Sequence, residues 1–307
     1  MPEIVLLGVL VMAYGSPASP DGIEAYYTHV RRGRPPPPEL LADLQRRYDA
    51  IGGVSPLVAR TTAQVEALQL ALGPGHVAVL GQKHAPPFIE DAVEQLADLG
   101  AGRIVGLVLA PHTSALSTGE YHSRGEEAAA AAGIPYSTVG PWHDHPTLVD
   151  LLAERVVDAL SRLPQGARVE TLFTAHSLPL RALGLDDPSY PEQLRQTGEA
   201  VAARAGLGAH WRVAWQSAGR TPDPWIGPDV LDVMRGLPDE GIEGVVVCPA
   251  GFVSDHLEVL YDLDVEAAAA AASAGLLLER TASLNADQRF ISLLAALVGI
   301  AAGAPVY

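Results

Sequence analysis

The sequence predicts an α/β fold of the doubly wound kind, with parallel sheets in two related lobes. Three observations point to it: apolar β-rich runs recur along the 307 residues, amphipathic stretches separate them, and one strand–helix pattern occurs twice. Alternating strands and helices are typical of parallel sheets covered by helices. We expect strands at residues 4–13, 76–80, 103–110, 169–174, 211–216 and 244–248, and helices at 57–72, 88–99, 147–163 and 190–205.

The repeated pattern indicates where the lobes lie. Residues 87–111 run from Pro-Phe-Ile through a helical stretch, a glycine-containing turn and an apolar strand to a proline. Residues 224–249 run from Pro-Trp-Ile to a proline in the same order. We therefore expect a first lobe at residues 1–145, a second lobe at 146–284, and a C-terminal helix at 285–307 that packs back on the body.

Composition narrows the classes of function. Cys248 is the only cysteine, which excludes a disulfide framework, a multi-cysteine zinc site and an iron–sulfur cluster held by four thiolates, and which fits a reducing cytoplasmic setting. A net charge of −16 argues against nucleic acid as a partner, because phosphate neutralisation needs a basic surface. The N-terminal apolar run is too short to span a bilayer, and glycines interrupt the C-terminal one, so we expect no membrane insertion.

Side chains that can bind metals or anions recur near the ends of the expected strands. Tyr14, His84, His112 and His176 each follow a strand within a few residues, and an acidic segment at 251–266 follows the last strand. In open parallel sheets, ligands bind outside the carboxyl ends of the strands. These positions are therefore the candidates for a site, whereas no Walker or GxGxxG loop follows any strand to support a nucleotide cofactor.

Segment 251–266 holds the densest group of acidic side chains. Glu258, Asp262 and Glu266 stand four residues apart, so an α-helix would project them from one face, where they repel one another unless a cation binds. A solvated acidic face is the plainer explanation. Imidazole and carboxylate together suit a divalent first-row metal such as Fe²⁺, so His176 with these acids is the favoured metal site; the same imidazole can act as a base.

Five of the basic residues are close together in the sequence: Arg31, Arg32, Arg34, Arg46 and Arg47. On a chain whose only lysine is Lys83, this cluster is a candidate anion site, since a guanidinium binds a carboxylate through two parallel hydrogen bonds. An ordinary solvated basic face explains the cluster equally well. His143 and His145 have the spacing of a metal pair but lie in a loop without an acidic ladder nearby, and we assign them no role.

Six motifs together resemble ferrochelatase, the enzyme family that inserts Fe²⁺ into a porphyrin in haem synthesis. In family order they are VMAYGSP at 11–17, YYTHVRRGR at 26–34, RYDAIGGVSPL at 47–57, KHAPPFIEDAV at 83–93, FTAHSLP at 173–179 and GFVSDHLEVLYDLD at 251–264. The resemblance spans nearly the whole chain and implies two Rossmann-like lobes with the active-site cleft between them. The motifs are most similar to the short soluble bacterial form that acts on coproporphyrin III.

The resemblance also implies roles for individual residues. His176 and Glu258 match the catalytic pair and metal ligands that face the pyrrole nitrogens, and Asp262 and Glu266 match acids that lead toward the surface along a locally π-helical segment. Tyr14 matches an axial ligand of the product iron. The residues that match contacts to the macrocycle or its propionates are Tyr14, Arg31, Arg47, Tyr48, Ser55 and Tyr121, and His84 is a further candidate.

The resemblance implies insertion of Fe²⁺ into coproporphyrin III to give iron coproporphyrin (coproheme). We expect a cytoplasmic monomer that has porphyrin and Fe²⁺ as partners, holds no permanent cofactor, and passes its product to a downstream haem-pathway enzyme. Three alternatives stay open: a protoporphyrin IX ferrochelatase, a tetrapyrrole chelatase for cobalt or nickel, and a non-catalytic two-lobed haem or porphyrin carrier. Histidine and carboxylate ligands alone do not select iron, whereas a carrier would have little need for the acidic ladder.

Overall fold

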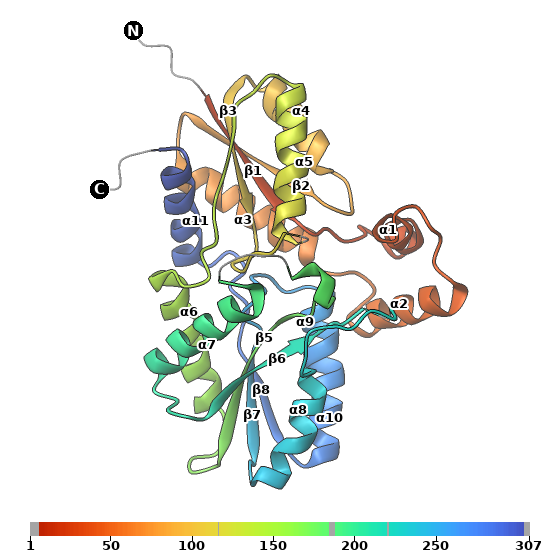
Figure 1. Cartoon of the computed structure of the whole chain (residues 1–307), viewed down its shortest axis with the longest axis vertical. Coiled ribbons are helices and arrows are strands. Elements are labelled where there is room, and N and C mark those ends of the chain that lie inside the picture. Colours follow the sequence, from red (N-terminus) through yellow and green to blue (C-terminus); the bar gives the residue numbers. More distant parts are fainter. Residues whose placement is uncertain (1–5, 116, 184–187, 220, 304–307) are drawn as a thin grey trace. The chain divides into compact units, whose positions relative to one another are not determined.

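The chain forms two compact units in a computed structural model that describes residues 6–115, 117–183, 188–219 and 221–303 (Figure 1). The first unit comprises 1–109, 118–141 and 285–307, and the second comprises 110–117 and 142–284. The predicted boundary after residue 145 therefore lies close to the observed change of unit after Pro141. Segment 110–117 belongs to the second unit, and the C-terminal helix belongs to the first.

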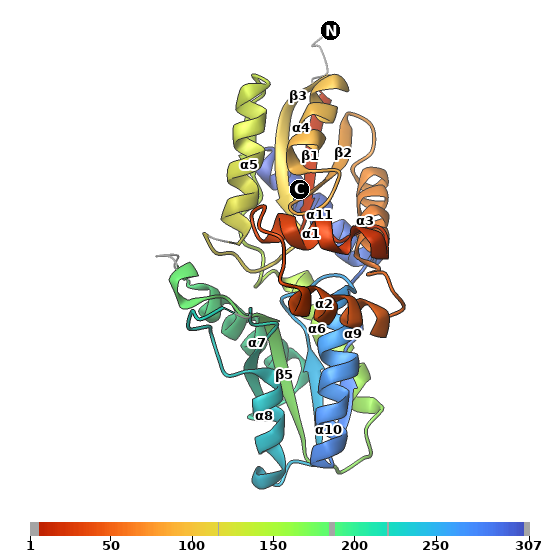
Figure 2. The same ribbon diagram turned by 90° about the vertical axis from the view of Figure 1, so that its right-hand side faces the viewer.

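The first unit is a four-stranded parallel sheet with the strand order β2-β1-β3-β4. Helices α4 and α5 pack against each other, α3 packs against α11, and α5 and α3 lie on opposite sides of the sheet (Figure 2). Its strands are β1 (Leu6–Ala13), β2 (His76–Gln82), β3 (Ala101–Val108) and β4 (Tyr136–Thr138). Its helices are η1 (Pro20–Gly22), α1 (Ile23–Val30), α2 (Pro38–Ala50), α3 (Leu57–Leu72), α4 (Ile89–Asp98), α5 (Thr118–Ala131) and α11 (Gln288–Ala301).

The second unit repeats this plan with the strand order β6-β5-β7-β8, again all parallel. Helices α6 and α7 cover one side of its sheet, and α8 and α10 cover the other (Figure 1). Its strands are β5 (Val169–His176), β6 (Trp211–Gln216), β7 (Gly244–Cys248) and β8 (Leu277–Arg280). Its helices are α6 (Pro146–Ser161), η2 (Leu180–Ala182), α7 (Tyr190–Ala205), α8 (Val230–Gly236), η3 (Leu237–Glu240), α9 (Leu257–Tyr261), the π-helix η4 (Asp262–Ala267) and α10 (Ala268–Ala274).

The equal strand orders confirm the two related lobes that the repeated sequence pattern predicts. Both units also use the same connection after their second strand. The backbone N–H of Gln82 donates to the Pro87 carbonyl at 2.7 Å, and that of Trp215 donates to the Pro228 carbonyl at 2.9 Å. An aspartate stabilises the start of each following helix: Asp91, in the first turn of α4, accepts from the N–H of the N-cap residue Phe88, and Asp229, the N-cap of α8, accepts from the Leu231 N–H.

The six predicted strands are all present, although Ile4 of the first lies outside the described residues. Two of them run further than predicted, to Gln82 and to His176. The edge strands β4 and β8 and the helices α1 and α2 were not predicted. β4 has three residues and β8 has four, which is too short for an alternation of polar and apolar side chains to register.

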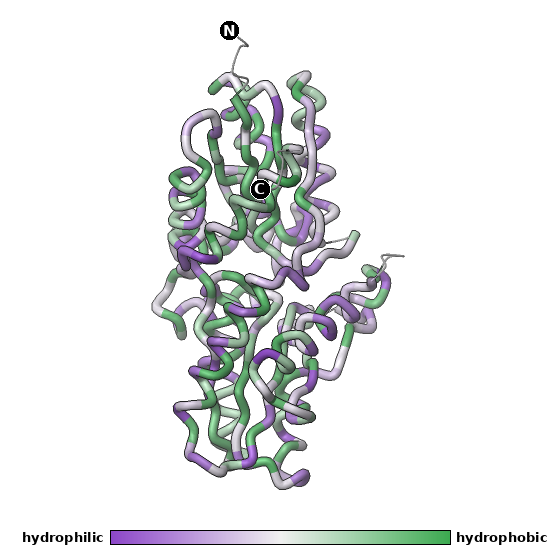
Figure 3. Tube along the Cα trace, turned by 90° about the vertical axis from the view of Figure 1, so that its left-hand side faces the viewer, coloured by the Kyte–Doolittle hydropathy of each residue, from purple (hydrophilic) through white to green (hydrophobic). Residues whose placement is uncertain are grey.

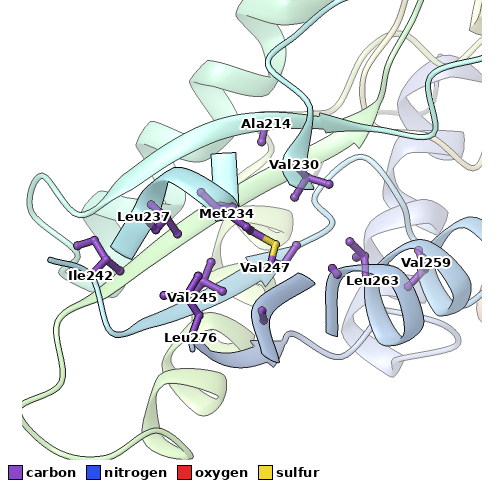
Figure 4. Close-up of a cluster of buried hydrophobic side chains, with 13 residues drawn as sticks. Ala214, Val230, Met234, Leu237, Ile242, Val245, Val247, Val259, Leu263 and Leu276 are labelled. Carbon is purple, nitrogen blue, oxygen red and sulfur yellow. The ribbon is translucent and has the colours of Figure 1, made fainter. Parts of the chain in front are cut away.

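Hydrophobic residues, green in Figure 3, are concentrated along the strands, and the buried hydrophobic residues come from both strands and helices. In the second unit, Met234 of α8, Val245 and Val247 of β7, Val259 of α9 and Leu263 of η4 belong to one cluster of buried apolar side chains (Figure 4). All five side chains are 0–1% exposed. This cluster fixes α9 and η4 on the sheet, and removal of such a buried side chain costs about 2–5 kcal/mol.

Among the described residues, no helix combines the length and apolar character needed to cross a membrane.

Candidate active site

His176 is the last residue of β5, so its side chain lies at the carboxyl end of the second unit's sheet. Its main chain is held by Tyr190, whose hydroxyl donates to the His176 carbonyl at 3.0 Å. The imidazole Nδ1 makes a close contact with the Ser177 carbonyl, which assigns the N–H to Nδ1 and leaves Nε2 directed to other partners. About one third of the side chain is exposed, so a ligand can reach it.

Glu258 lies in the first turn of α9 and is brought to His176 by the loop after β7. The N–H of Gly251 in this loop donates to the Thr174 carbonyl at 3.0 Å. A Cβ at Gly251 would stand 2.5 Å from the Ala175 Cβ, which real side chains do not tolerate. Only glycine therefore lets the loop approach β5 closely enough to place α9 beside the strand end.

His176 and Glu258 form an ion pair, with Nε2 and Oε1 3.6 Å apart. Burial alone would lower the pKa of His176, but the charge of Glu258 and the hydrogen bonds to Glu258 and Ser177 outweigh it and raise the pKa to about 9. Burial would likewise raise the pKa of Glu258, yet the neighbouring His176 and then His256 hold it well below its usual range. At neutral pH the pair is an imidazolium and a carboxylate.

The structure adds His256 to this pair. Its Nε2 lies 3.7 Å from Glu258 Oε2, and its Nδ1 lies 2.9 Å from the Ser254 carbonyl, so the two carboxylate oxygens of Glu258 each face one imidazole. His256 lies within the acidic segment 251–266 but was not among the predicted site residues. Its position two residues before Glu258 was the available signal, but only the extended backbone at His256 turns its ring back toward that carboxylate.

The acids that follow Glu258 do not form the simple ladder that an α-helix predicts. The segment from Asp262 to Ala267 is a π-helix, as the family resemblance implied, and its wider turn makes the projection of three acids from one α-helical face wrong. Asp262 is 7% exposed and accepts a short hydrogen bond from the Ser217 hydroxyl. Glu266 is half-buried and lines a hollow of about 580 Å³ together with Leu231 and Arg235 of α8.

The other acids of the segment have structural partners. Asp264 is exposed and paired with Arg280 at 2.6 Å, and Asp255 accepts from the Ser283 hydroxyl at 2.8 Å. Within the described ranges, no group of three or more His, Cys, Asp or Glu side chains is arranged to hold a metal ion. The His176–Glu258 pair can therefore offer a passing metal two ligands, and the remaining positions are left for water or substrate nitrogen.

In the first unit, Tyr14 directly follows β1 and is 42% exposed. Its ring packs on His84, with ring centres 4.6 Å apart, and its carbonyl accepts from the His84 N–H at 3.0 Å. The Nδ1 atoms of His84 and His29 lie 3.1 Å apart. Burial, and then the positive charges of Lys83, His29 and Arg124, lower the pKa of His84 to about 3, so this imidazole stays neutral.

A cationic hollow of about 370 Å³ lies beside these rings. Lys83 Nζ is 2.8 Å from Glu120 Oε2 and 5.0 Å from the centre of the Tyr121 ring. Arg124 donates to both carboxylate oxygens of Glu90, at 2.7 and 2.6 Å. The lining residues are His29, Val30, Arg32, Gly33, Lys83, His84, Glu120 and Arg124. The sequence did not indicate this grouping, because its members come from three separate segments.

The remaining predicted binding residues of the first unit occupy different settings. Arg31 ends α1, and its Nε is buried without a hydrogen-bond partner, which leaves a donor available for an anion. Arg47 of α2 donates to Asp43 at 3.1 Å, and Tyr48 beside it is 1% exposed. Ser55 is buried, and its hydroxyl accepts from the Leu57 N–H. Tyr121 on α5 is 8% exposed.

The other histidines that the sequence singled out have structural partners. His112 Nε2 lies 2.9 Å from the Thr197 hydroxyl, and His143 Nε2 lies 3.0 Å from Gln196 Oε1. Both of these partners belong to α7. His145 caps α6, where its side chain accepts from a backbone N–H. The spacing of His143 and His145 therefore reflects a helix start and a buried contact.

The chain matches the ferrochelatase family over residues 7–301. Three curated relatives are named coproporphyrin III ferrochelatase. The relative from Geobacillus kaustophilus is 45% identical over 95% of this chain and 94% of its own length, and that from Anoxybacillus flavithermus is 44% identical over 95% of each chain. The relative from Bacillus subtilis is 42% identical over 95% of this chain and 96% of its own.

Solved structures of chelatases share the fold. SirB from Bacillus subtilis with Fe³⁺ superimposes with a TM-score of 0.60 at 14% identity, covering 97% of this chain and 96% of SirB. CbiX, described as the terminal enzyme for biosynthesis of sirohaem in denitrifying bacteria, gives 0.55 at 17% identity, covering 96% and 99%. At these identities the likeness concerns the fold alone, and it confirms the predicted chelatase-like arrangement of two α/β lobes.

Proposed function

This chain belongs to the ferrochelatase family, and from that premise we propose that it inserts Fe²⁺ into coproporphyrin III to give iron coproporphyrin. The observation that carries the proposal is the ion pair of His176 and Glu258, one third exposed at the carboxyl end of a parallel sheet. The curated relatives named for this reaction, at 42–45% identity, support the choice of substrate.

Metal insertion releases two protons from the pyrrole nitrogens for each Fe²⁺ that enters. Glu258 is a carboxylate at neutral pH and binds a proton only weakly, so it can take one of them and pass it on to water. His176 carries a proton in the resting pair, and it must release that proton to water before its Nε2 can bind a metal ion or take the second pyrrole proton, which also leaves to water. Fe²⁺ arriving at Glu258 supplies the positive charge that replaces the imidazolium proton.

We assign carboxylate binding to the first unit and metal chemistry to the second. Coproporphyrin carries four propionates, and the chain has a net charge of −16, so a local cationic surface is needed to hold a tetra-anion. The unpartnered Nε of Arg31 and the cations around the 370 Å³ hollow support this assignment. Tyr14, exposed at the end of β1, is suited by its phenol oxygen to bind the iron of the product.

Fe²⁺ is a substrate in this proposal, and the chain supplies no site for an iron–sulfur cluster, because Cys248 is the only cysteine and is buried in β7. Burial raises the pKa of its thiol to about 12. A monomeric state, a cytoplasmic location and transfer of the product to a downstream haem-pathway enzyme are further parts of the proposal. Light scattering, cell fractionation and pull-down of the loaded protein test them.

The direct test is anaerobic turnover with Fe²⁺ and either coproporphyrin III or protoporphyrin IX, followed by the absorbance of the metallated product. We expect a higher kcat/KM for coproporphyrin III. Competition with Co²⁺ and Ni²⁺ tests metal choice. Tight binding of iron coproporphyrin without any metal-dependent turnover would identify a carrier and refute the proposal.

A further inference from the structure

Gln216, at the end of β6, makes hydrogen bonds to both segments that carry the His176–Glu258 pair. Its side chain is 1% exposed, its Nε2 donates to the Glu258 carbonyl at 3.0 Å, and its Oε1 accepts from the Thr174 hydroxyl at 2.8 Å. Its own carbonyl accepts from the Ser177 N–H at 2.7 Å. One residue therefore connects the main chain of Glu258 to the strand segment on both sides of His176.

Ser217, the next residue, contacts the second acid of the helix. Its hydroxyl donates to Asp262 Oδ2, and Asp262 is 7% exposed, so this is a buried carboxylate with an oriented donor. Ser217 also has a φ of +61°, in the left-handed region. A residue with a Cβ is disfavoured there, and glycine would adopt the conformation at no steric cost. The hydroxyl is the feature that glycine lacks.

An unfavourable backbone conformation persists where the surrounding structure holds it, and such residues gather at functional sites. The two contacts are consecutive in sequence and act on successive acids: Gln216 on the backbone of Glu258, and Ser217 on the carboxylate of Asp262. Glu258 lies in the first turn of the short helix α9, and Asp262 is the first residue of η4, which follows α9 directly. Helical hydrogen bonds are locally rearranged at such a junction, so external contacts decide where its groups lie.

We propose that Gln216 and Ser217 are positioning residues, which hold Glu258 and Asp262 at the separation that metal transfer to the porphyrin requires. The inference rests on the proposed function. The amide of Gln216 fixes the height of the first turn of α9, and the hydroxyl of Ser217 fixes the orientation of the Asp262 carboxylate. A displacement of about 1 Å in groups of this kind lowers a rate by about 100-fold.

The sharpest test compares Ser217→Gly with Ser217→Ala. Both variants lose the hydroxyl, but only glycine relieves the left-handed backbone, so the glycine variant has the higher Tm. We expect kcat for Fe²⁺ insertion to fall about 10- to 100-fold in both, with the KM for coproporphyrin III unchanged. If kcat instead follows stability, so that the glycine variant is as active as the wild type, the hydroxyl has no positioning role and the proposal is overturned.

Asn285→Gly is the matched control. Asn285 is a non-glycine residue with a φ of +45° in the first unit, and its backbone carbonyl, which accepts from Gln64 at 2.8 Å, is kept in the variant. This variant relieves the same kind of strain away from the His176–Glu258 pair, and we expect it to leave kcat unchanged.

The contact made by Gln216 is tested separately. Gln216→Met replaces the amide by an apolar side chain of similar size. We expect the same fall in kcat at constant KM, and a wild-type kcat in this variant contradicts the assignment of Gln216.

A readout without turnover separates this inference from the proposed function. Co²⁺ is added to the porphyrin-free protein, and its visible absorption band is titrated in the wild type and in Ser217→Gly. We expect the dissociation constant for Co²⁺ to rise about tenfold and the band to change shape, because the carboxylate of Asp262, whose charge also acts on His176, is no longer oriented. Identical titrations overturn the positioning role. A wild type that binds Co²⁺ but inserts no Fe²⁺ refutes the proposed function instead.

Discussion

His84 and His176 lie at the carboxyl ends of sheets with the same strand order, yet their pKa values move in opposite directions. Burial and nearby cations lower the pKa of His84 to about 3, whereas Glu258 outweighs burial and raises the pKa of His176 to about 9. The first unit surrounds its imidazole with Lys83 and Arg124, and the second surrounds its imidazole with carboxylates. One backbone plan thus carries the proposed anion site in one unit and the proposed cation site in the other.

The difference lies in the loops after the strands. In the first unit, β2 leads through Lys83 and His84 directly into α4, and the charged partners come from α1 and α5. In the second unit, β7 leads through the Gly251 turn into α9 and η4, which carry the acids. Fold alone does not determine the chemistry of such a site, because side chains on the connecting loops supply it.

The largest effect is expected when the His176–Glu258 pair, the proposed cation site, is disrupted. His176→Ala removes the imidazole from the pair, and we expect kcat for Fe²⁺ insertion to fall about 10²- to 10⁴-fold while porphyrin binding is retained. Fluorescence quenching of bound coproporphyrin III measures the binding. His145→Ala is the matched control, because this histidine caps α6 and takes no part in the pair. Unchanged insertion by His176→Ala would exclude the imidazole from the reaction.

The opposite pKa shifts of His84 and His176 can be measured directly. In an NMR titration of the imidazole C2–H signals, we expect His84 to remain neutral down to about pH 3 and His176 to remain protonated up to about pH 9. The His176 contribution to stability is fully present below about pH 6.5 and is lost as pH rises through 9, because the folded state binds this proton more tightly than the unfolded chain does and releases it only near pH 9. A midpoint near 6.5 for either residue contradicts the electrostatic contrast.

The stability of the protein in acid tests whether buried His112 stays neutral in the folded state. His112 is 2% exposed, and burial, then His143, lower its pKa to about 3. Below about pH 6.5 the unfolded chain therefore binds a proton that the folded chain does not, so the free energy of unfolding decreases as the pH falls, by about 2.5 kcal/mol from this residue between pH 7 and 4.5. Urea unfolding at the two pH values measures it. His112→Gln, whose amide nitrogen can take the place of Nε2 beside Thr197, is expected to lose that share of the acid sensitivity.

A smaller effect is expected from the anion site. Arg31→Ala removes one guanidinium, and loss of a charge-assisted hydrogen bond raises the KM for coproporphyrin III about tenfold. The KM for protoporphyrin IX, which has fewer carboxylates, rises less, so the preference between the two porphyrins narrows. Arg195→Ala in the second unit is the control, because that exposed guanidinium pairs only with its helix neighbours Glu192 and Glu199 in the contacts described. If Arg31→Ala leaves the preference for coproporphyrin III over protoporphyrin IX unchanged, Arg31 takes no part in substrate recognition.

The smallest effect is expected for Asp264 and Asp255, two acids near α9 that pair with Arg280. Arg280 pairs with Asp264 at 2.6 Å and with Asp255 at 3.6 Å. Arg280→Gln is expected to lower the free energy of unfolding by about 1 kcal/mol or less and to leave kcat within about twofold. Thermal unfolding and turnover together check this. A large loss of kcat would show that these acids belong to the same functional set as Glu258.

Periodicity and strand-end positions predicted much of the fold and part of the site. The alternation of strands and helices predicted the parallel sheets, because buried parallel strands read as continuous apolar runs. His176 and Tyr14 were found because they follow such runs. The motif resemblance, and not spacing, indicated the pairing of His176 with Glu258 and the π-helical segment; spacing alone gave an α-helical ladder.

Contacts between distant segments could not be predicted in this way. Gln216 and Ser217 lie about 40 residues before the acids that they contact, and neither residue type is unusual at the end of a strand. His29 meets His84 only because α1 and the loop after β2 converge. A polar residue's partner is set by tertiary structure, so one sequence shows that a donor exists without showing what it donates to.

The π-helix η4 also determines which changes of length the second unit tolerates. A π-turn is an α-helix that has accommodated one additional residue, and each residue of an α-helix advances the chain by about 100° around the axis. Deleting a single residue between Asp262 and Ala267 would let the segment close as an ordinary α-helix, in which fewer residues complete the same turn, so α10 would keep its orientation. A single-residue deletion in this short window is therefore expected to be tolerated better than one inside α10, which would shift the residues after it by about 100° around the helix axis.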